Sequence, residues 1–368
     1  MNGKGKHFII SGVAACIGLL LLITPVYGAD IIIGGDSTDI GTIIFVSPKP
    51  GDSATANGTA LLNTLNGITD ASDLNPYLIK LGPGIYDLGT CDTSGTPPFS
   101  CVVHMKPYVS IEGSGEKATK ITAAVSSAVL PPTAGTVMGA DNAELRFLSV
   151  ESTGTGTHTT AIVNFETSPS ILHVKVKATG LGSTNSYGFY NSLGSAPVMT
   201  NVTADASGGS NNNRGIFNSL SSAPVMTNVT ATASGGTVSY GISIGDSSTP
   251  VIANVTATAS GGTTNNYGIY SNNALPTTMT NVTATASGGT NSYGLYFLNY
   301  SSATTILIDR STFEGSTNSI ANTANLTLRI GASKLAGPIS GGGTFTCASS
   351  YNGSYVALGA DCLLLPPP

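Results

Sequence analysis

The segment Pro224–Gly236, "PVMTNVTATASGG", decides the fold because the chain repeats it three more times. The near-copies read "PVMTNVTADASGG", "PVIANVTATASGG" and "PTTMTNVTATASGG", and they start at Pro197, Pro250 and Pro276. The asparagines that they share are Asn201, Asn228, Asn254 and Asn281. These asparagines are 27, 26 and 27 residues apart. A period of roughly 20–50 residues indicates a solenoid, in which each unit stacks on the next.

The pattern inside each unit predicts short strands. The stretch "VTATA" after the asparagine alternates apolar and polar residues, which is typical of a strand with one buried face. The apolar position that follows the asparagine, or His173 in a degenerate copy, holds Val174, Val202, Val229, Val255 and Val282. A second strand in "YGIS", "YGIY" and "YGLY" places Ile216, Ile242, Ile269 and Leu295 in the core. A short third segment, such as Pro224–Met226, leads back to the asparagine, and three strands per unit predict a parallel β-helix.

The conserved position of the asparagine within the units predicts a bend. Asparagine tolerates left-handed backbone geometry better than most residues, so it suits the corner before "VTATA". Asparagine side chains in successive coils could also bond to one another along the axis. In the degenerate copy "PSILHVKVKATG", His173 takes this place. The alternative is that the Asn-x-Thr sequences are glycosylation sites.

The chain resembles right-handed parallel β-helices of the pectin-lyase-like superfamily. Its first part, with "GTIIFVSPKPGD", "TALLNTLNGI", "NPYLIKLGPGIYDLG" and "MKPYVSIEGSGEKATKIT", resembles the opening of pectin methylesterases. The resemblance covers most of residues 42–335 and implies a short N-terminal capping helix. The superfamily includes lyases, hydrolases, esterases, adhesins and inert surface proteins, so the fold does not imply an activity.

Residues 1–28 have the pattern of an export signal. Lys4 and Lys6 precede the apolar run from Phe8 to Val26, and Gly28 follows as a small residue at the cleavage site. An uncleaved membrane anchor or lipidation at Cys16 are the alternatives. The tail "LLLPPP" is too short to span a membrane. We therefore expect a secreted, periplasmic or cell-surface protein without a stable membrane span after cleavage.

The mature chain has four cysteines. Their proximity in the sequence favours the pairs Cys91–Cys101 and Cys347–Cys362. A metal site is the alternative, but neither pair has CxxC spacing, so we expect no metal and no cofactor. The predicted regions are a signal peptide (1–28), an N-terminal capping region with the first coils (29–140), the repeats (141–335, near-identical at 197–300) and a disulfide-closed end (336–368).

Composition argues against several functions. The net charge is −5 and the sequence has no long run of basic residues, which argues against a nucleic-acid partner. The chain has no glutamine, which pectin methylesterases use to stabilise the oxyanion. Weak catalytic candidates remain: Asp309 and Arg310 in "IDRSTFEG", and His158, Glu166 and His173 in the degenerate coils 141–175. A polysaccharide esterase or lyase built from those coils is the alternative function. Asp205 aligns with Lys177 one coil earlier, which predicts a cross-strand ion pair.

Two repeated columns are candidates for binding. After the core position of the second strand stand Tyr190, Phe217, Ser243, Tyr270 and Tyr296. If the column faces outward, its four aromatic residues could bind glycans, and the alternative is that the rings stack on one another between coils. A second column shares the parity of the core and is expected to cap the interior: Tyr187, Arg214, Tyr240, Tyr267 and Tyr293.

The outward residues of "VTATA" form Thr-x-Thr ranks, as at Thr230 and Thr232, and such ranks resemble ice-binding surfaces. Threonine is, however, a common outward residue of any strand. The near-identical coils extend a surface and do not multiply a catalytic site. The sequence thus favours an exported, non-catalytic structural or glycan-binding protein, with the enzyme as alternative and ice binding as a third possibility.

Overall fold

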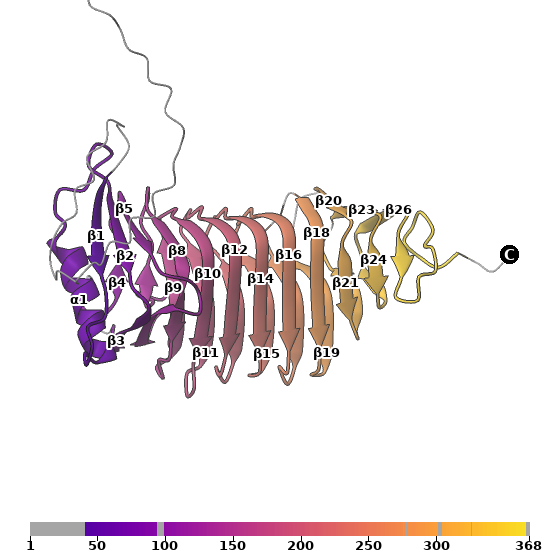
Figure 1. The fold of residues 1–368 in the computed structure, drawn as a ribbon. Coiled ribbons are helices and arrows are strands. Elements are labelled where there is room, and N and C mark those ends of the chain that lie inside the picture. Colours follow the sequence, from indigo (N-terminus) through magenta and orange to yellow (C-terminus); the bar gives the residue numbers. More distant parts are fainter. Residues whose placement is uncertain are drawn as a thin grey trace, which may run out of the picture.

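The computed structural model describes residues 41–93, 99–274, 276, 278–300, 304–324 and 326–365. The proposed signal peptide lies outside the described residues. The chain winds into a parallel β-helix of stacked coils, with the helix α1 (Ala54–Gly67) near one end and the C-terminal strands at the other (Figure 1). The predicted all-β fold with one short N-terminal helix is confirmed.

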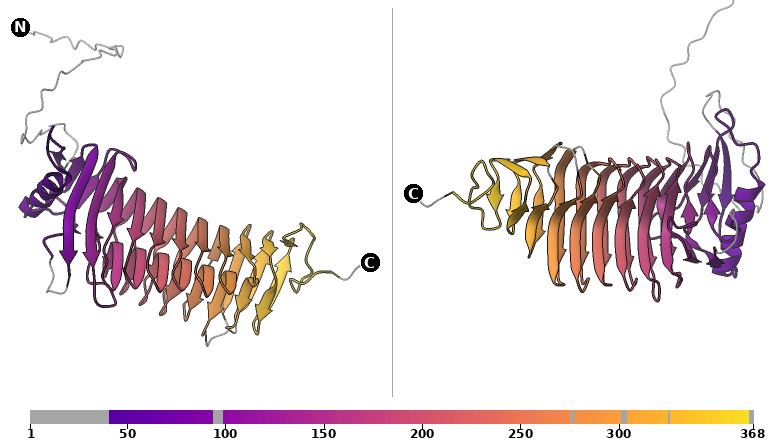
Figure 2. Two further views of the ribbon diagram at one scale, coloured as in Figure 1. Left: turned by 90° about the horizontal axis from the view of Figure 1, so that it is seen from below. Right: turned by 180° about the vertical axis from the view of Figure 1, so that it is seen from behind.

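Two parallel sheets form the walls of the solenoid, and Figure 2 shows them from two further sides. The larger sheet contains β1 (Thr42–Val46), β2 (Tyr77–Leu81), β3 (Gly84–Asp92), β5 (Val109–Glu112), β6 (Thr119–Ser126), β8 (Glu144–Ser152), β10 (Ser170–Thr179), β12 (Val198–Ser207), β14 (Val225–Ser234), β16 (Val251–Ser260), β18 (Thr278–Ser287), β20 (Thr305–Asp309), β21 (Thr312–Gly315), β23 (Thr327–Gly331), β24 (Lys334–Ala336), β26 (Thr344–Ala348) and β27 (Tyr351–Asn352). The smaller sheet contains β4 (Val103–His104), β7 (Val137–Met138), β9 (His158–Phe165), β11 (Asn185–Ser192), β13 (Asn212–Asn218), β15 (Val238–Gly245), β17 (Asn265–Asn272), β19 (Asn291–Leu298), β22 (Asn318–Asn322) and β25 (Ile339–Gly341).

The "VTATA" strand and the short segment before it form one bent strand in each central coil. In β14 the backbone turns at Asn228, whose φ is 55°, and Asn201, Asn254 and Asn281 have nearly the same value. The bend role predicted for the asparagines is confirmed, while the expected third strand is the first half of a longer one. His173 adopts the same geometry, with φ 50°.

The core columns follow the predicted alternation. The valines after the bend and the aliphatic residues of the smaller sheet are buried, and Val229 pairs in register with Val202 and Val255. Each coil therefore buries the apolar surface of its neighbours, which no single coil could do alone.

Side-chain amides link the coils at several places, among them a ladder at the bend and one inside the smaller sheet. At the bend, the Nδ2 of Asn228 donates to the Oδ1 of Asn201 at 3.1 Å, and the Nδ2 of Asn281 donates to that of Asn254 at 2.8 Å. A second ladder inside the smaller sheet joins Asn164, Asn191 and Asn218 at 2.8 and 2.9 Å, and all three are fully buried. The second ladder pairs the amide groups between its members, whereas the Oδ1 of Asn164 and the Nδ2 of Asn218 at its two ends have no partner among the described residues.

The two ends are closed by different devices. At the N-terminal end, α1 packs on β3: the side-chain amide of Asn57 donates to the carbonyl of Ile85 at 3.1 Å, and a Cβ at Gly58 would lie 2.1 Å from the carbonyl oxygen of Asp87. The two predicted disulfides, Cys91–Cys101 and Cys347–Cys362, are both present.

Candidate functional site

The outer side of the smaller sheet carries both aromatic columns. The pairing of β15 with β17 skips the glycine between the two tyrosine positions, so Tyr267 and Tyr270 project to the same side, with ring centroids 5.0 Å apart. A Cβ at Gly268 would lie 2.6 Å from the carbonyl oxygen of Gly294, so only glycine fits there. The prediction that the Tyr187 column caps the interior is wrong, because this irregularity moves it beside the other column.

The rings pack into a layer of two groups, which Arg214 joins. Within the columns they stack, as in Tyr267 on Tyr293 at 5.3 Å and Tyr270 on Tyr296 at 5.8 Å. Between the columns they meet edge to face, as in Tyr293 against Tyr296 at 4.8 Å. The faces of the rings therefore contact rings of the neighbouring coils, which is the stacking alternative predicted from the sequence. Tyr270 and Tyr296 are half-buried.

The aromatic candidates differ in how far solvent reaches them. Tyr190 is only 3% exposed and supports its neighbours, whereas Phe217 is half-buried. Ser243, where the column lacks a ring, is also 3% exposed, so the break is covered. Burial raises the pKa of Tyr190 and of Tyr270 to about 12, hence these phenols stay protonated and can donate hydrogen bonds at neutral pH.

Arg214 replaces a tyrosine in the second column and lies among the rings. Its guanidinium carbon is 4.7 Å from the centroid of Phe217 and 4.6 Å from that of Tyr240. Its Nη1 donates to the hydroxyl of Tyr187 at 3.3 Å, while its buried Nε has no partner among the described residues. A cation over aromatic faces stabilises the layer by roughly 0.5–2 kcal/mol.

The histidine and glutamate candidates do not converge. His158 begins β9 and Glu166 follows its end, so about 25 Å of strand separates them at roughly 3.3 Å per residue. His158 is 6% exposed; burial lowers its pKa, as does the nearby Arg214, and its Nδ1 is 3.1 Å from the Nδ2 of Asn185. Glu166 lies exposed in a turn.

The other catalytic candidates have structural contacts. His173 lies in the bend ladder, with its Nε2 3.1 Å from the Nδ2 of Asn201 and its ring stacked on Phe147 at 5.3 Å. Asp309 and Arg310 form an exposed ion pair at 2.8 Å. The described residues contain no group of three or more His, Cys, Asp or Glu side chains placed to hold a metal ion.

Charged residues of the degenerate coils pair with one another on the larger sheet. Glu112 bonds to Lys80 at 2.8 Å and to Arg146 at 2.6 Å. Burial by itself would raise the pKa of Glu112, but Lys80 and Arg146 outweigh it and hold that pKa below its usual value. These acids are therefore ionised partners of a coil-to-coil ladder, which is unlike the raised pKa of a general acid.

The predicted ion pair between Lys177 and Asp205 is wrong, because Lys177 pairs with Glu151 instead. The two residues align in adjacent strands, but the Nζ of Lys177 lies 3.6 Å from Glu151, on the other side. Glu151 also binds Lys120 at 2.8 Å. Burial opposes ionisation of Glu151, yet the two lysines together lower its pKa.

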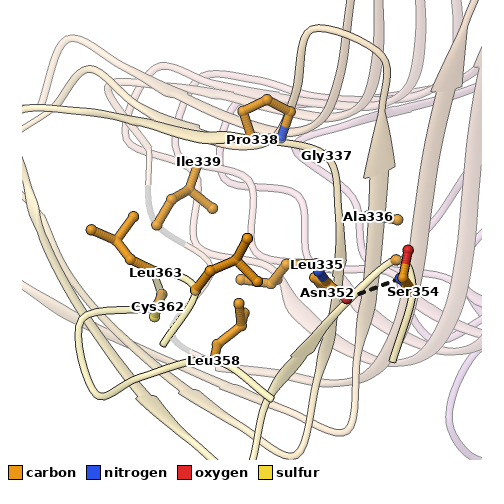
Figure 3. Close-up of a pocket in the computed structure, with 12 residues that line it drawn as sticks. Leu335, Ala336, Gly337, Pro338, Ile339, Asn352, Ser354, Leu358, Cys362 and Leu363 are labelled. Carbon is orange, nitrogen blue, oxygen red and sulfur yellow. Dashed lines mark hydrogen bonds between the residues drawn. The ribbon is translucent and has the colours of Figure 1, made fainter. Parts of the chain in front are cut away.

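A depression of about 430 Å³ lies at the C-terminal end (Figure 3). Its labelled lining includes Leu335, Ile339, Leu358 and Leu363, next to the disulfide residue Cys362. Within the described part of the chain, no helix combines the length and the apolar character needed to cross a membrane.

Comparison of the sequence with family models finds no match, and neither does comparison with curated proteins. Several solved structures are similar in shape. The catalytic domain of a GH87 alpha-1,3-glucanase in complex with tetrasaccharides has a TM-score of 0.48 at 13% identity, over 88% of this chain and 68% of that one. The A-module of mannuronan C-5 epimerase AlgE6 from Azotobacter vinelandii has a TM-score of 0.41 at 14% identity, over 80% and 85%.

A pectin methylesterase from Yersinia enterocolitica has a TM-score of 0.37 at 13% identity, over 83% of this chain and 93% of that chain. At such identity the likeness concerns the fold alone. That fold is a parallel β-helix.

Proposed function

We propose that the chain is a non-catalytic surface protein that binds glycans along the aromatic face of its smaller sheet. The observation that carries this proposal is the layer of half-buried rings on β13, β15, β17 and β19, held in register by the coils. The two aromatic columns on these strands hold tyrosine, phenylalanine, serine and arginine but no carboxylate. Hydrolysis of a glycosidic bond typically needs two carboxylates on opposite sides of that bond, so this face favours binding over turnover.

The packing of the rings determines which of their atoms a glycan would contact. Because the ring faces lie against neighbouring rungs, a ligand meets ring edges and phenol hydroxyls. Tyrosine combines an apolar body with a polar tip, which suits the mixed surface of a sugar. The rigid ladder keeps these hydroxyls in fixed positions, which lowers the entropy cost of binding.

Glycan-array binding of the purified protein tests the proposal, with Tyr270→Phe plus Tyr296→Phe as the first variant. This pair keeps the stacked rings and removes two hydroxyls, so we expect at least a ten-fold loss of affinity with the fold intact. Thr305→Ala plus Thr344→Ala, at exposed positions of the larger sheet near the C-terminal end, is the matched control and should bind normally. If the phenylalanine pair binds every glycan as well as the unaltered protein, the face is only structural.

The same panel of polysaccharides tests the enzyme alternative. Release of methanol or of an unsaturated product, abolished by His158→Ala or Glu166→Ala, would establish catalysis in the degenerate coils. We expect no turnover, because His158 and Glu166 lie at opposite ends of β9.

A further inference from the structure

A second depression lies on the outer side of the larger sheet, where β3, β6, β8 and β10 stack. Its volume is about 520 Å³. The charged residues that line it are Lys117, Lys120, Lys175, Lys177, Glu116 and Glu151. Four ammonium groups against two carboxylates give this depression a positive excess in a chain whose net charge is −5.

The register explains the shape of the depression. Lys120 and Lys175 both align with Ser149, from opposite sides, so a short side chain stands between two long ones. Adjacent rungs are about 4.8 Å apart, which places the two lysine backbones about 10 Å from each other. Ile85 aligns with Lys120 on the next rung and is 48% exposed, which adds an apolar contact at the edge.

The lysines are only partly neutralised by the protein itself. Lys120 and Lys177 share one carboxylate, that of Glu151, at 2.8 and 3.6 Å. Lys117 and Lys175 have no carboxylate partner in the part of the chain that the structure describes. The depression therefore keeps positive charge available to an anion from solution.

The lysine row continues into a row of hydroxyl groups. Lys175 aligns with Thr203, and this column runs on through Thr230 and Thr256, which are exposed. A ligand that lies along the solenoid axis would meet ammonium groups first and then hydroxyls at every rung. Such an order suits a chain that carries both anionic groups and hydroxyls.

We infer that this depression binds an anionic polysaccharide, with two or more of its anionic groups among the lysines and its hydroxyls along the threonine row. Lysine is a point charge without the planar fork of arginine, so the site responds to negative charge and does not require a planar carboxylate. Sulfate, phosphate and carboxylate groups are thus all acceptable. The site lies on a different sheet from the aromatic face and does not depend on that proposal.

Calorimetric titration with dextran sulfate, polygalacturonate and uncharged dextran tests the inference. We expect binding of at least one charged polymer, weakened as salt screens the charges, and no binding of dextran. Lys117→Gln plus Lys175→Gln should weaken binding at least ten-fold, because it removes two ammonium groups without uncovering a carboxylate. The comparison between the two charged polymers identifies the anionic group that the site prefers.

Two control variants make the test specific. Arg329→Gln plus Lys334→Gln changes the net charge equally near the C-terminal end and should leave binding intact. Tyr270→Phe plus Tyr296→Phe should also leave it intact, which separates this site from the aromatic face. Equal loss in the arginine–lysine control, or equal affinity for inorganic sulfate and for the polymer, would overturn the inference, as would unchanged binding by the double lysine variant.

Discussion

At the scale of single residues, the backbone geometry and the hydrogen bonds at the bend explain why each repeat has an asparagine there. The backbone at Asn228 has φ 55°, where a Cβ costs most residues about 1–2 kcal/mol. Its amide also donates to Asn201 in the preceding coil. His173 shows that the position accepts another polar residue, since it adopts the same conformation and lies 3.1 Å from Asn201. Backbone geometry, more than glycosylation, accounts for the repeated Asn-Val-Thr.

We expect Asn228→Ala to lower the free energy of unfolding by about 1–2 kcal/mol, since alanine loses both the tolerance of left-handed geometry and the hydrogen bond. Asn228→Gly loses only the bond at no steric cost, so its effect should be smaller. Thr230→Ala, at an exposed position of the same strand, is the control and should change little. Urea unfolding followed by circular dichroism measures the three. Equal stability of the alanine and glycine variants would contradict the strain argument.

At the scale of the strand, the Tyr-Gly pair determines what the smaller sheet shows to solvent. Strict alternation puts Tyr267 with the core residue Ile269, and this is where the sequence-based prediction failed. The glycine between them is skipped in the register, so the strand changes side at that point. Alternation predicts regular strands well, but an irregularity depends on contacts between coils, here between Gly268 and the carbonyl of Gly294.

Gly268→Ala tests the close approach directly. The new Cβ would lie 2.6 Å from the Gly294 oxygen and 2.8 Å from the backbone nitrogen of Thr285, so backbone must move. We expect a loss of about 1–3 kcal/mol, the usual range for overpacking, and weaker near-ultraviolet circular dichroism from the tyrosines. Gly245→Ala is the matched control, because the nearest atom to its Cβ would be 3.8 Å away. Similar losses in both variants would show that close approach is not the cause.

At the scale of the whole molecule, the repeat period sufficed to predict the fold, but charged sites could not be predicted in the same way. Lys177 aligns with Glu151 on one side and Asp205 on the other, and only the structure shows that its side chain reaches Glu151. The degenerate coils lack the bend asparagine by which the repeats are aligned, so the alignment of Lys120 with Ser149 could not be predicted from the sequence either. The register of near-identical coils can be predicted by aligning their sequences, whereas the register of diverged coils is known only from the structure.

The stack also predicts how the molecule responds to the loss of one end. In a solenoid each coil contacts only its neighbours, so damage at an end should stay local. Cys347→Ser plus Cys362→Ser opens a loop with a sequence separation of 15, worth about 3 kcal/mol in the chain-entropy view. Hydrogen exchange should then accelerate in β24, β26 and β27 while β12–β18 stay protected. The pair Cys91→Ser and Cys101→Ser should instead affect β3 and β6. If either double variant loses protection along the whole solenoid, the coils unfold as one cooperative unit and the nearest-neighbour description fails.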